Sequence, residues 1–197
     1  MDIKRIAIYF KAALATFGIQ KLPEPNYLFK NGELDYDNYS HDEKKLFWAS
    51  HTKAVSNETI KKGLLSSDIF MQINCISYLE ATGITPKLSD TDKDYLLFNN
   101  KPGSTTVRAD FIALKTTSLS DAQINRLLKD SEFKVRWALS KRNINFTEAQ
   151  LLIGSKDEMS FISSAYKAKH QEYKANQEEI RLTSFLTSTS RVSKAAP

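Results

Sequence analysis

Apolar residues between Ser120 and Ala165 recur at the three- and four-residue spacing of helix faces. Residues 120–130 predict one helix, because Ser120 and Gln123 form a capping pattern that an apolar face follows. A second helix is predicted after a short turn, with Asn143 as its stop and an apolar stripe formed by Phe133, Val135, Ala138 and Leu139. Together the two segments predict a helical hairpin.

The hairpin pattern begins again at Thr147, which lies 27 residues after Ser120. Weaker copies begin at Ser89 and at Ser56 or Asn57. Counted from Ser56, successive starts are 33, 31 and 27 residues apart. Internal repetition of this kind is typical of repeat architectures, in which neighbouring units bury each other's apolar faces. We therefore expect four helix pairs over residues 56–166.

The landmarks of the third copy keep a fixed order, which is Leu127, Leu128, Asp130, Val135, Arg136, Ala138 and Leu139. Val107 and Arg108 repeat the Val-Arg step in the second copy. This order resembles HEAT-like repeats, especially the short bacterial variants with a Val-Arg helix, over about residues 56–166. The resemblance implies an all-α fold, in which antiparallel helix pairs form a right-handed stack, an α-solenoid. Such a stack offers an extended binding surface.

The chain before the repeats predicts three elements. A packed N-terminal helix is predicted up to Gly18, and binding to a membrane surface is the alternative interpretation. Its apolar face is formed by Ile3, Ile6, Phe10, Leu14 and Phe17. The Asn31-Gly32 pair within the aromatic segment 27–36 is typical of a small β-hairpin, and a structured loop is the alternative. A capping helix is expected from Ser40 to Val55. We expect the aromatic segment 27–36 to seal one end of the helical stack, and an aromatic recognition arm is its other interpretation.

The chain after the repeats is polar and rich in helix-forming residues. A long terminal helix is predicted over residues 167–186. Residues 187–197 are expected to form a flexible tail, because they carry little apolar surface. One helical-repeat domain is therefore expected over residues 1–186.

Glycine and proline are scarce, at 6 and 5 of 197 residues, and this favours helices over a β-rich fold with frequent turns. With 41% hydrophobic residues the chain has enough apolar surface for a substantial core. Cys75 is the only cysteine, so no intramolecular disulfide can form, and a reducing, cytoplasmic location is expected. No apolar run reaches transmembrane length, so we expect no membrane partner.

The sequence carries no recognisable catalytic or metal-binding motif. His41, His51 and His170 are the only histidines, and none belongs to a zinc-ligand pattern. The six glycines do not form a phosphate-binding loop. We therefore expect a protein that is not an enzyme and has no cofactor, catalytic site or metal site.

Positive charge is concentrated in part of the chain. The net charge is +5, and residues 120–146 contain six Lys or Arg against three Asp or Glu, an excess of three. Lys134, Trp137 and Lys141 share one helix face, an arrangement that suits phosphate backbones or an acidic protein surface. The alternative is a solvated face with Trp137 packed on the next hairpin. The candidate partner-binding residues are Arg108, Arg126, Lys129, Lys134, Arg136, Trp137, Lys141 and Arg142.

Arg108 and Arg136 have a second interpretation, in which they bond to carboxylates or carbonyls between helices. The patterns together favour binding over catalysis. We expect a non-enzymatic protein-binding adaptor or inhibitor, which acts on another protein through the surface of a helical-repeat slab. The alternative is a nucleic-acid-binding HEAT-like protein that uses the basic face around residues 126–142.

Overall fold

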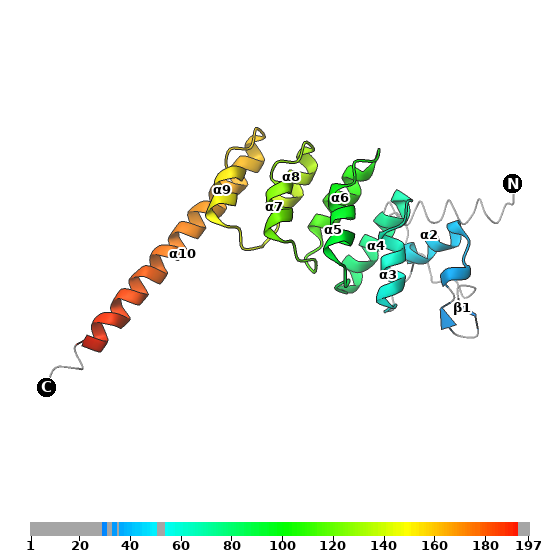
Figure 1. The fold of residues 1–197 in the computed structure, drawn as a ribbon, viewed down its shortest axis with the longest axis horizontal. Coiled ribbons are helices and arrows are strands. Elements are labelled where there is room, and N and C mark those ends of the chain that lie inside the picture. The colour runs from blue at the N-terminus through cyan, green and yellow to red at the C-terminus, as the bar shows by residue number, and fades with distance from the viewer. Residues whose placement is uncertain (1–28, 31–32, 35, 51–53, 193–197) are drawn as a thin grey trace. The chain divides into compact units, whose positions relative to one another are not determined.

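The computed structural model describes residues 29–30, 33–34, 36–50 and 54–192 of the chain (Figure 1). The N-terminal helix predicted up to Gly18 lies outside these residues. Strands β1 (Phe29–Lys30) and β2 (Glu33–Leu34) pair antiparallel. The Asn31-Gly32 turn of the expected hairpin also lies outside the described residues, so the hairpin stays a prediction.

The described chain consists mainly of α-helices, as the apolar spacing predicts for an all-α protein. A short 3-10 helix, η2 (Tyr36–Asn38), precedes them. The helices are α2 (His41–Ser50), α3 (Asn57–Leu64), α4 (Ile69–Thr82), α5 (Asp90–Phe98), α6 (Ser104–Ala113), α7 (Asp121–Leu127), α8 (Phe133–Ser140), α9 (Glu148–Gly154) and α10 (Ser160–Val192). Among the helices that the structure describes, none combines the length and apolar content needed to cross a membrane.

Local capping explains where the helix pairs begin. The side chains of Ser56, Ser89 and Thr147 each accept a hydrogen bond from the backbone N–H three residues later. Ser120 Oγ accepts in the same way from the N–H of Gln123, at 3.3 Å. Each bond satisfies one of the N–H groups that a helix start leaves without an internal partner. All four starts predicted from the sequence therefore coincide with capped helices.

A side chain from the second helix of each pair also donates to a carbonyl at the end of the first helix or in the turn that follows it. In two pairs this side chain is an arginine. Arg108 Nε donates to the Leu97 carbonyl at 2.8 Å, and Arg136 Nη1 donates to the Asp130 carbonyl at 2.7 Å. Carbonyls at a helix end lack an intrahelical donor, so the arginines satisfy groups that burial would otherwise leave unpaired.

Uncharged side chains make the corresponding bond in the other two pairs. Gln72 Nε2 donates to the Leu64 carbonyl at the end of α3, at 2.9 Å. Ser163 Oγ donates to the Ser155 carbonyl just after α9, at 2.7 Å. In all four pairs a side chain of the second helix therefore donates a hydrogen bond to a carbonyl at or just after the end of the first helix, although the residue type differs.

Contacts within the chain group it into two compact units, Met1–Gln123 and Ile124–Pro197. The single domain expected over residues 1–186 stays a prediction. In the first unit, α4 packs against α2, α3 and α6, and α6 packs against α5. Trp48 is buried in this core and donates from Nε1 to Tyr36 Oη at 2.8 Å. Gly63 leaves the space that the indole ring occupies, because a Cβ there would lie 2.6 Å from the ring.

In the second unit, α10 packs against α8 and α9. Tyr166 of α10 is 1% exposed, and a Cβ on Gly154 would lie only 2.4 Å from its ring carbons. Phe146 meets the same ring edge-on, with centroids 5.4 Å apart. The Tyr166 ring therefore packs directly against the α9 backbone and forms part of this core.

Two helix boundaries differ from the prediction. The sequence predicted the second helix of the fourth pair, a separate terminal helix over 167–186 and a flexible tail, but α10 runs without a break from Ser160 to Val192. No glycine or proline interrupts these residues, and the good helix formers of 167–186 join the first two segments; α10 then continues into residues 187–192 of the expected tail. The capping helix is shorter than predicted, since α2 ends at Ser50 and Val55 is not helical.

Candidate interaction surface

Three of the predicted partner-binding residues are buried. Arg108, Arg136 and Arg142 are 3%, 7% and 6% exposed. Arg108 lies in the first unit, where it bonds to the Leu97 carbonyl. Arg142 lies in the second unit, and burial lowers the pKa of its guanidinium. Arg136 and Arg142 are therefore not part of an exposed basic face around residues 126–142, and Arg108 bonds between helices, as its second interpretation has it.

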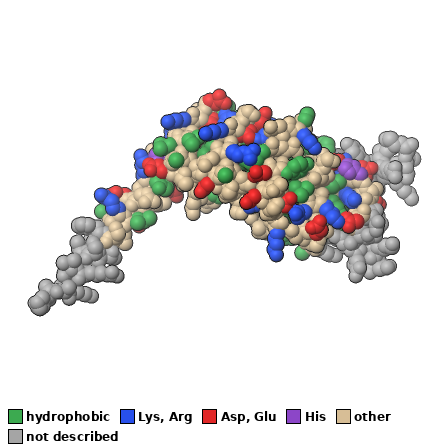
Figure 2. Space-filling model, in the orientation of Figure 1, with side chains coloured by type: hydrophobic (Ala, Val, Ile, Leu, Met, Phe, Trp, Pro, Cys, Tyr) green, Lys and Arg blue, Asp and Glu red, His purple; other side chains and the backbone are tan. Residues whose placement is uncertain are grey.

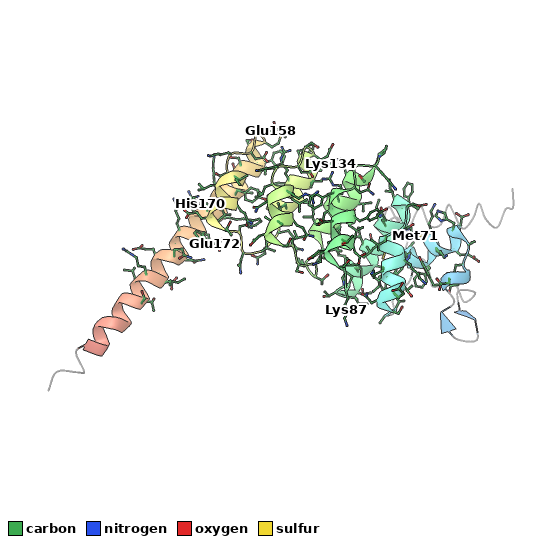
Figure 3. All side chains as sticks on the ribbon, in the orientation of Figure 1. Met71, Lys87, Lys134, Glu158, His170 and Glu172 are labelled. Carbon is green, nitrogen blue, oxygen red and sulfur yellow. The ribbon has the colours of Figure 1, made fainter. Side chains whose placement is uncertain are left out.

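Arg136 is surrounded by acidic and main-chain acceptors of the second unit. Its Nε donates to Asp157 Oδ2 at 2.7 Å, and its Nη2 donates to Glu158 Oε1 at 2.9 Å (Glu158 is labelled in Figure 3). The hydrogen bond to Asp157 raises the pKa of Arg136, burial opposes this effect, and the attraction of both carboxylates adds to it. Arg136 also donates to the Asp130 carbonyl. Its bonds to Asp157 and Glu158 connect α8 to the turn before α10.

The remaining basic candidates are exposed. Arg126 and Lys129 lie on and just after α7, and Lys134 and Lys141 lie on and just after α8. On the face seen in Figure 2, Asp and Glu side chains are interspersed with Lys and Arg. Within residues 120–146, four exposed Lys or Arg stand against three Asp or Glu that are not buried. The excess of three positive charges in the sequence is therefore reduced to one at the surface.

Trp137 is half-buried on α8. The ring of Phe161 on α10 meets it edge-on, with centroids 4.8 Å apart and planes at 88°. Lys141 Nζ lies 3.9 Å from the Trp137 ring centroid, a distance that allows a cation–π interaction. Trp137 thus packs on the next hairpin, as the alternative interpretation has it, and still reaches the surface.

Phe133, Trp137 and Phe161 together form what we call the aromatic surface. Phe133 and Phe161 are 42% and 40% exposed, and their ring centroids are 6.5 Å apart. Phe133 was predicted to be in the apolar stripe with Val135. Val135 is buried, but Phe133 is not. Phe161 was not identified from the sequence. The signal that marks it is its place directly before buried Ile162, which puts it on a different helix face.

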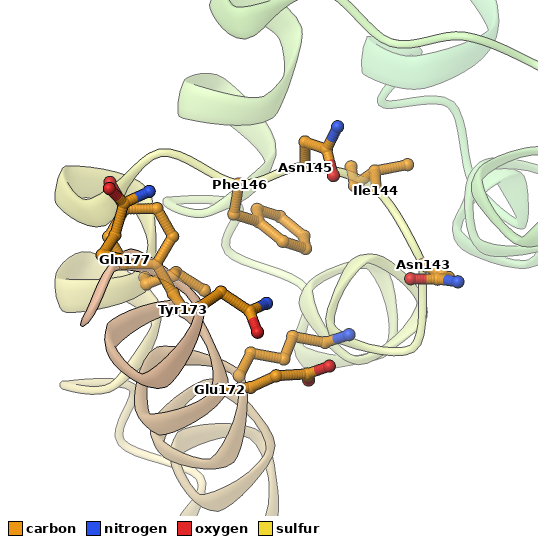
Figure 4. Close-up of a pocket in the computed structure, with 10 residues that line it drawn as sticks. Asn143, Ile144, Asn145, Phe146, Glu172, Tyr173 and Gln177 are labelled. Atoms are coloured by element: carbon orange, nitrogen blue, oxygen red, sulfur yellow. The ribbon is translucent and has the colours of Figure 1, made fainter. Parts of the chain in front are cut away.

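A pocket of about 320 Å³, which we call the polar pocket, lies in the second unit between the loop before α9 and α10 (Figure 4). Its lining residues are Asn143, Ile144, Asn145, Phe146, Leu151, Lys169, Glu172, Tyr173, Asn176 and Gln177. Four of them carry side-chain amides, and none of these amides makes a hydrogen bond within the described part of the chain. Sequence reasoning did not identify this pocket.

Two observations on the described residues concern metal binding and nucleophilic chemistry. Among them, no three His, Cys, Asp or Glu side chains are placed to hold a metal ion. Cys75 is fully buried, and burial raises the pKa of its thiol well above the usual value, which disfavours the nucleophilic thiolate.

No family model, curated protein or solved structure matches the chain.

Proposed function

We propose that this chain is a non-enzymatic protein-binding adaptor or inhibitor whose partner docks on the aromatic surface. The observation that carries the proposal is the exposure of Phe133 and Phe161, at 42% and 40%, although both rings lie against aromatic neighbours. Apolar surface left in water costs about 25 cal/mol per Å², and a partner that covers these rings removes that cost. Clustered aromatic side chains also supply much of the binding energy in protein interfaces.

A HEAT-like stack over residues 56–166 is part of this proposal. It is supported by the caps at the four helix-pair starts and by the donor that closes the first helix of every pair. Stacked pairs provide a long outer surface and little enclosed volume, which suits an adaptor. We place the protein in the cytoplasm, where a reduced Cys75 is expected.

Nucleic-acid binding is the less supported alternative, because Arg136 and Arg142 are buried and the surface charge of residues 120–146 is nearly balanced. Binding through phosphates falls steeply with salt. We expect any affinity for fluorescent DNA or RNA, duplex or single-stranded, to disappear by about 150 mM salt. Affinity that persists there, and that Lys134→Gln with Lys141→Gln weakens, would favour the nucleic-acid interpretation.

The protein-binding proposal is tested by comparing the partners that three forms of the full chain capture from cells. The forms are the wild type, Phe133→Ser/Phe161→Ser and Phe70→Ser, in which Phe70 is a 47% exposed phenylalanine of the first unit. We expect a partner that the wild type and Phe70→Ser retain and that the double variant loses. With the purified partner, the double variant should bind about thirtyfold more weakly, as for the loss of a 2 kcal/mol hot spot. Equal affinity for all three forms would remove the aromatic surface from the interface.

A further inference from the structure

One face of α10 joins the aromatic surface to the polar pocket. Phe161, Ala165, Ala168 and Glu172 follow at positions i, i+4, i+7 and i+11, so they form a single stripe along the helix. Ala165 is half-buried and Ala168 is exposed. Because their side chains are small, they do not obstruct the helix face between Phe161 and Glu172. Phe161 belongs to the aromatic surface and Glu172 lines the polar pocket. The stripe is therefore a continuous path between them.

The chemistry of the polar pocket suits a neutral, hydrogen-bonding ligand. Asn143, Asn145, Asn176 and Gln177 each present an NH₂ donor and a carbonyl acceptor, with no hydrogen-bond partner in the described chain. Lys169 and Glu172 add one positive and one negative charge, so the lining has no net charge with which to select an anion. Lys169 is also held by the Arg142 carbonyl, at 3.0 Å.

A peptide main chain has the donors and acceptors that these amides complement. Every residue except proline offers one N–H and one C=O. A helical partner would already have used most of these groups internally, whereas an extended segment presents them along its whole length. Figure 4 shows the loop residues Asn145 and Phe146 on one side of the pocket and the α10 residues Glu172 and Tyr173 on the other, so a strand between them would lie against both elements.

We propose that the polar pocket binds the main chain of an extended peptide segment of the partner that docks on the aromatic surface. This inference rests on the proposed function. Eleven helix positions separate Phe161 from Glu172, about 16 Å along the axis. An extended chain covers that distance with about five residues. The segment therefore carries an apolar side chain for the aromatic surface at one end and uses its peptide groups in the pocket at the other.

The probe is a linear peptide selected from a phage-displayed random library on the full chain and then synthesised with a fluorophore. Its affinity is measured by fluorescence polarisation for the wild type, Asn176→Ala/Gln177→Ala, Phe133→Ser/Phe161→Ser and Gln171→Ala. Gln171 is an exposed α10 amide outside the pocket and serves as the matched control. We expect the two double variants to bind at least about tenfold more weakly, the loss of one or two hydrogen bonds or of an aromatic anchor, and Gln171→Ala to bind like the wild type.

N-methylation of single peptide groups in the probe separates main-chain from side-chain recognition. It removes one N–H donor and leaves the side chain unchanged, so we expect at least one position at which affinity for the wild type falls about tenfold and affinity for Asn176→Ala/Gln177→Ala does not fall further. Selection of no binding peptide, or an amide double variant with wild-type affinity, overturns the pocket proposal. If Phe133→Ser/Phe161→Ser still loses affinity in that case, the proposed function stands without the pocket. If only the amide variant loses affinity, the pocket binds peptide and the aromatic surface does not.

Discussion

Replacing Arg136 by methionine tests whether this residue belongs to the framework of the second unit. The side chains of Arg136 and Asp157 are 8% and 5% exposed, and Arg136 Nε lies 2.7 Å from Asp157 Oδ2. Methionine retains most of the apolar stem and removes the charge and every donor. The substitution therefore leaves the buried Asp157 carboxylate without its cation and removes one donor to the Asp130 carbonyl.

The expected loss follows from the burial of each partner. Removing one member of a buried ion pair costs about 3–5 kcal/mol, because the other charge stays uncompensated. Glu158 adds little, since its side chain is 78% exposed and water screens it. Asp157 keeps a hydrogen bond from the Met159 N–H at 2.9 Å, which offsets part of the penalty. We therefore expect the free energy of unfolding of the second unit to fall by about 3 kcal/mol.

The assay is urea denaturation with hydrogen exchange read separately in α8 and α9, so that the second unit is distinguished from the first. Lys134→Met, an exposed change on the same helix, is the control and should cost less than about 0.5 kcal/mol. Arg136→Met/Asp157→Leu removes both partners and should recover much of the loss, because no buried charge remains. A loss below about 1 kcal/mol for Arg136→Met alone would refute the framework role.

Three further changes test the packing and the titration of single groups. Gly154→Ala should cost about 3 kcal/mol or more of unfolding free energy in urea, since the new Cβ would lie 2.4 Å from Tyr166 ring carbons; a loss below about 0.5 kcal/mol would contradict this packing. Tyr166→Phe should leave that free energy unchanged or raise it by about 1 kcal/mol, because the hydroxyl is buried without a hydrogen-bond partner among the described residues. A clear loss would show that the hydroxyl has a partner. Burial raises the pKa of Asp68, but hydrogen bonds from Lys45 and His41 outweigh it and lower the pKa below its usual value. This carboxylate therefore stabilises the fold above about pH 4, its unfolded value, and the contribution is lost as pH falls through the lower folded pKa. Asp68→Asn should flatten the decline in melting temperature over that acid range, and parallel curves for variant and wild type would contradict the argument.

Helix starts could be predicted because the interactions that fix them are local. Ser89 and Thr147 reach backbone groups only three residues away, so the residue types in a short window decide the cap. The continuous α10 was missed for a related reason. The polar segment after the fourth pair contains good helix formers and no breaker, and only the presence of a breaker would have justified a boundary near residue 167.

Side-chain direction could not be predicted, because partners distant in sequence decide it. Arg136 turns inward toward Asp157, which lies 21 residues later. Phe133 turns outward although it belongs to the same apolar run as buried Val135. The polar pocket depends on α9 bringing the loop around Asn145 close to Tyr173 of α10. Periodicity predicts which residues share a face, but the packing of other elements determines which face is covered.

A recurring arginine in a helical repeat has two physical explanations: recognition of a repeated ligand, or satisfaction of a repeated backbone group. Gln72 and Ser163 carry no charge, yet they donate to a carbonyl at or just after the end of the first helix, as Arg108 and Arg136 do. The four pairs therefore share a donor and not a charge. An anionic ligand would require the charge, whereas a helix end requires only an N–H or O–H group. The recurring donor position belongs to the framework, so the proposed recognition would use other, exposed side chains, of which Phe133 and Phe161 are the candidates.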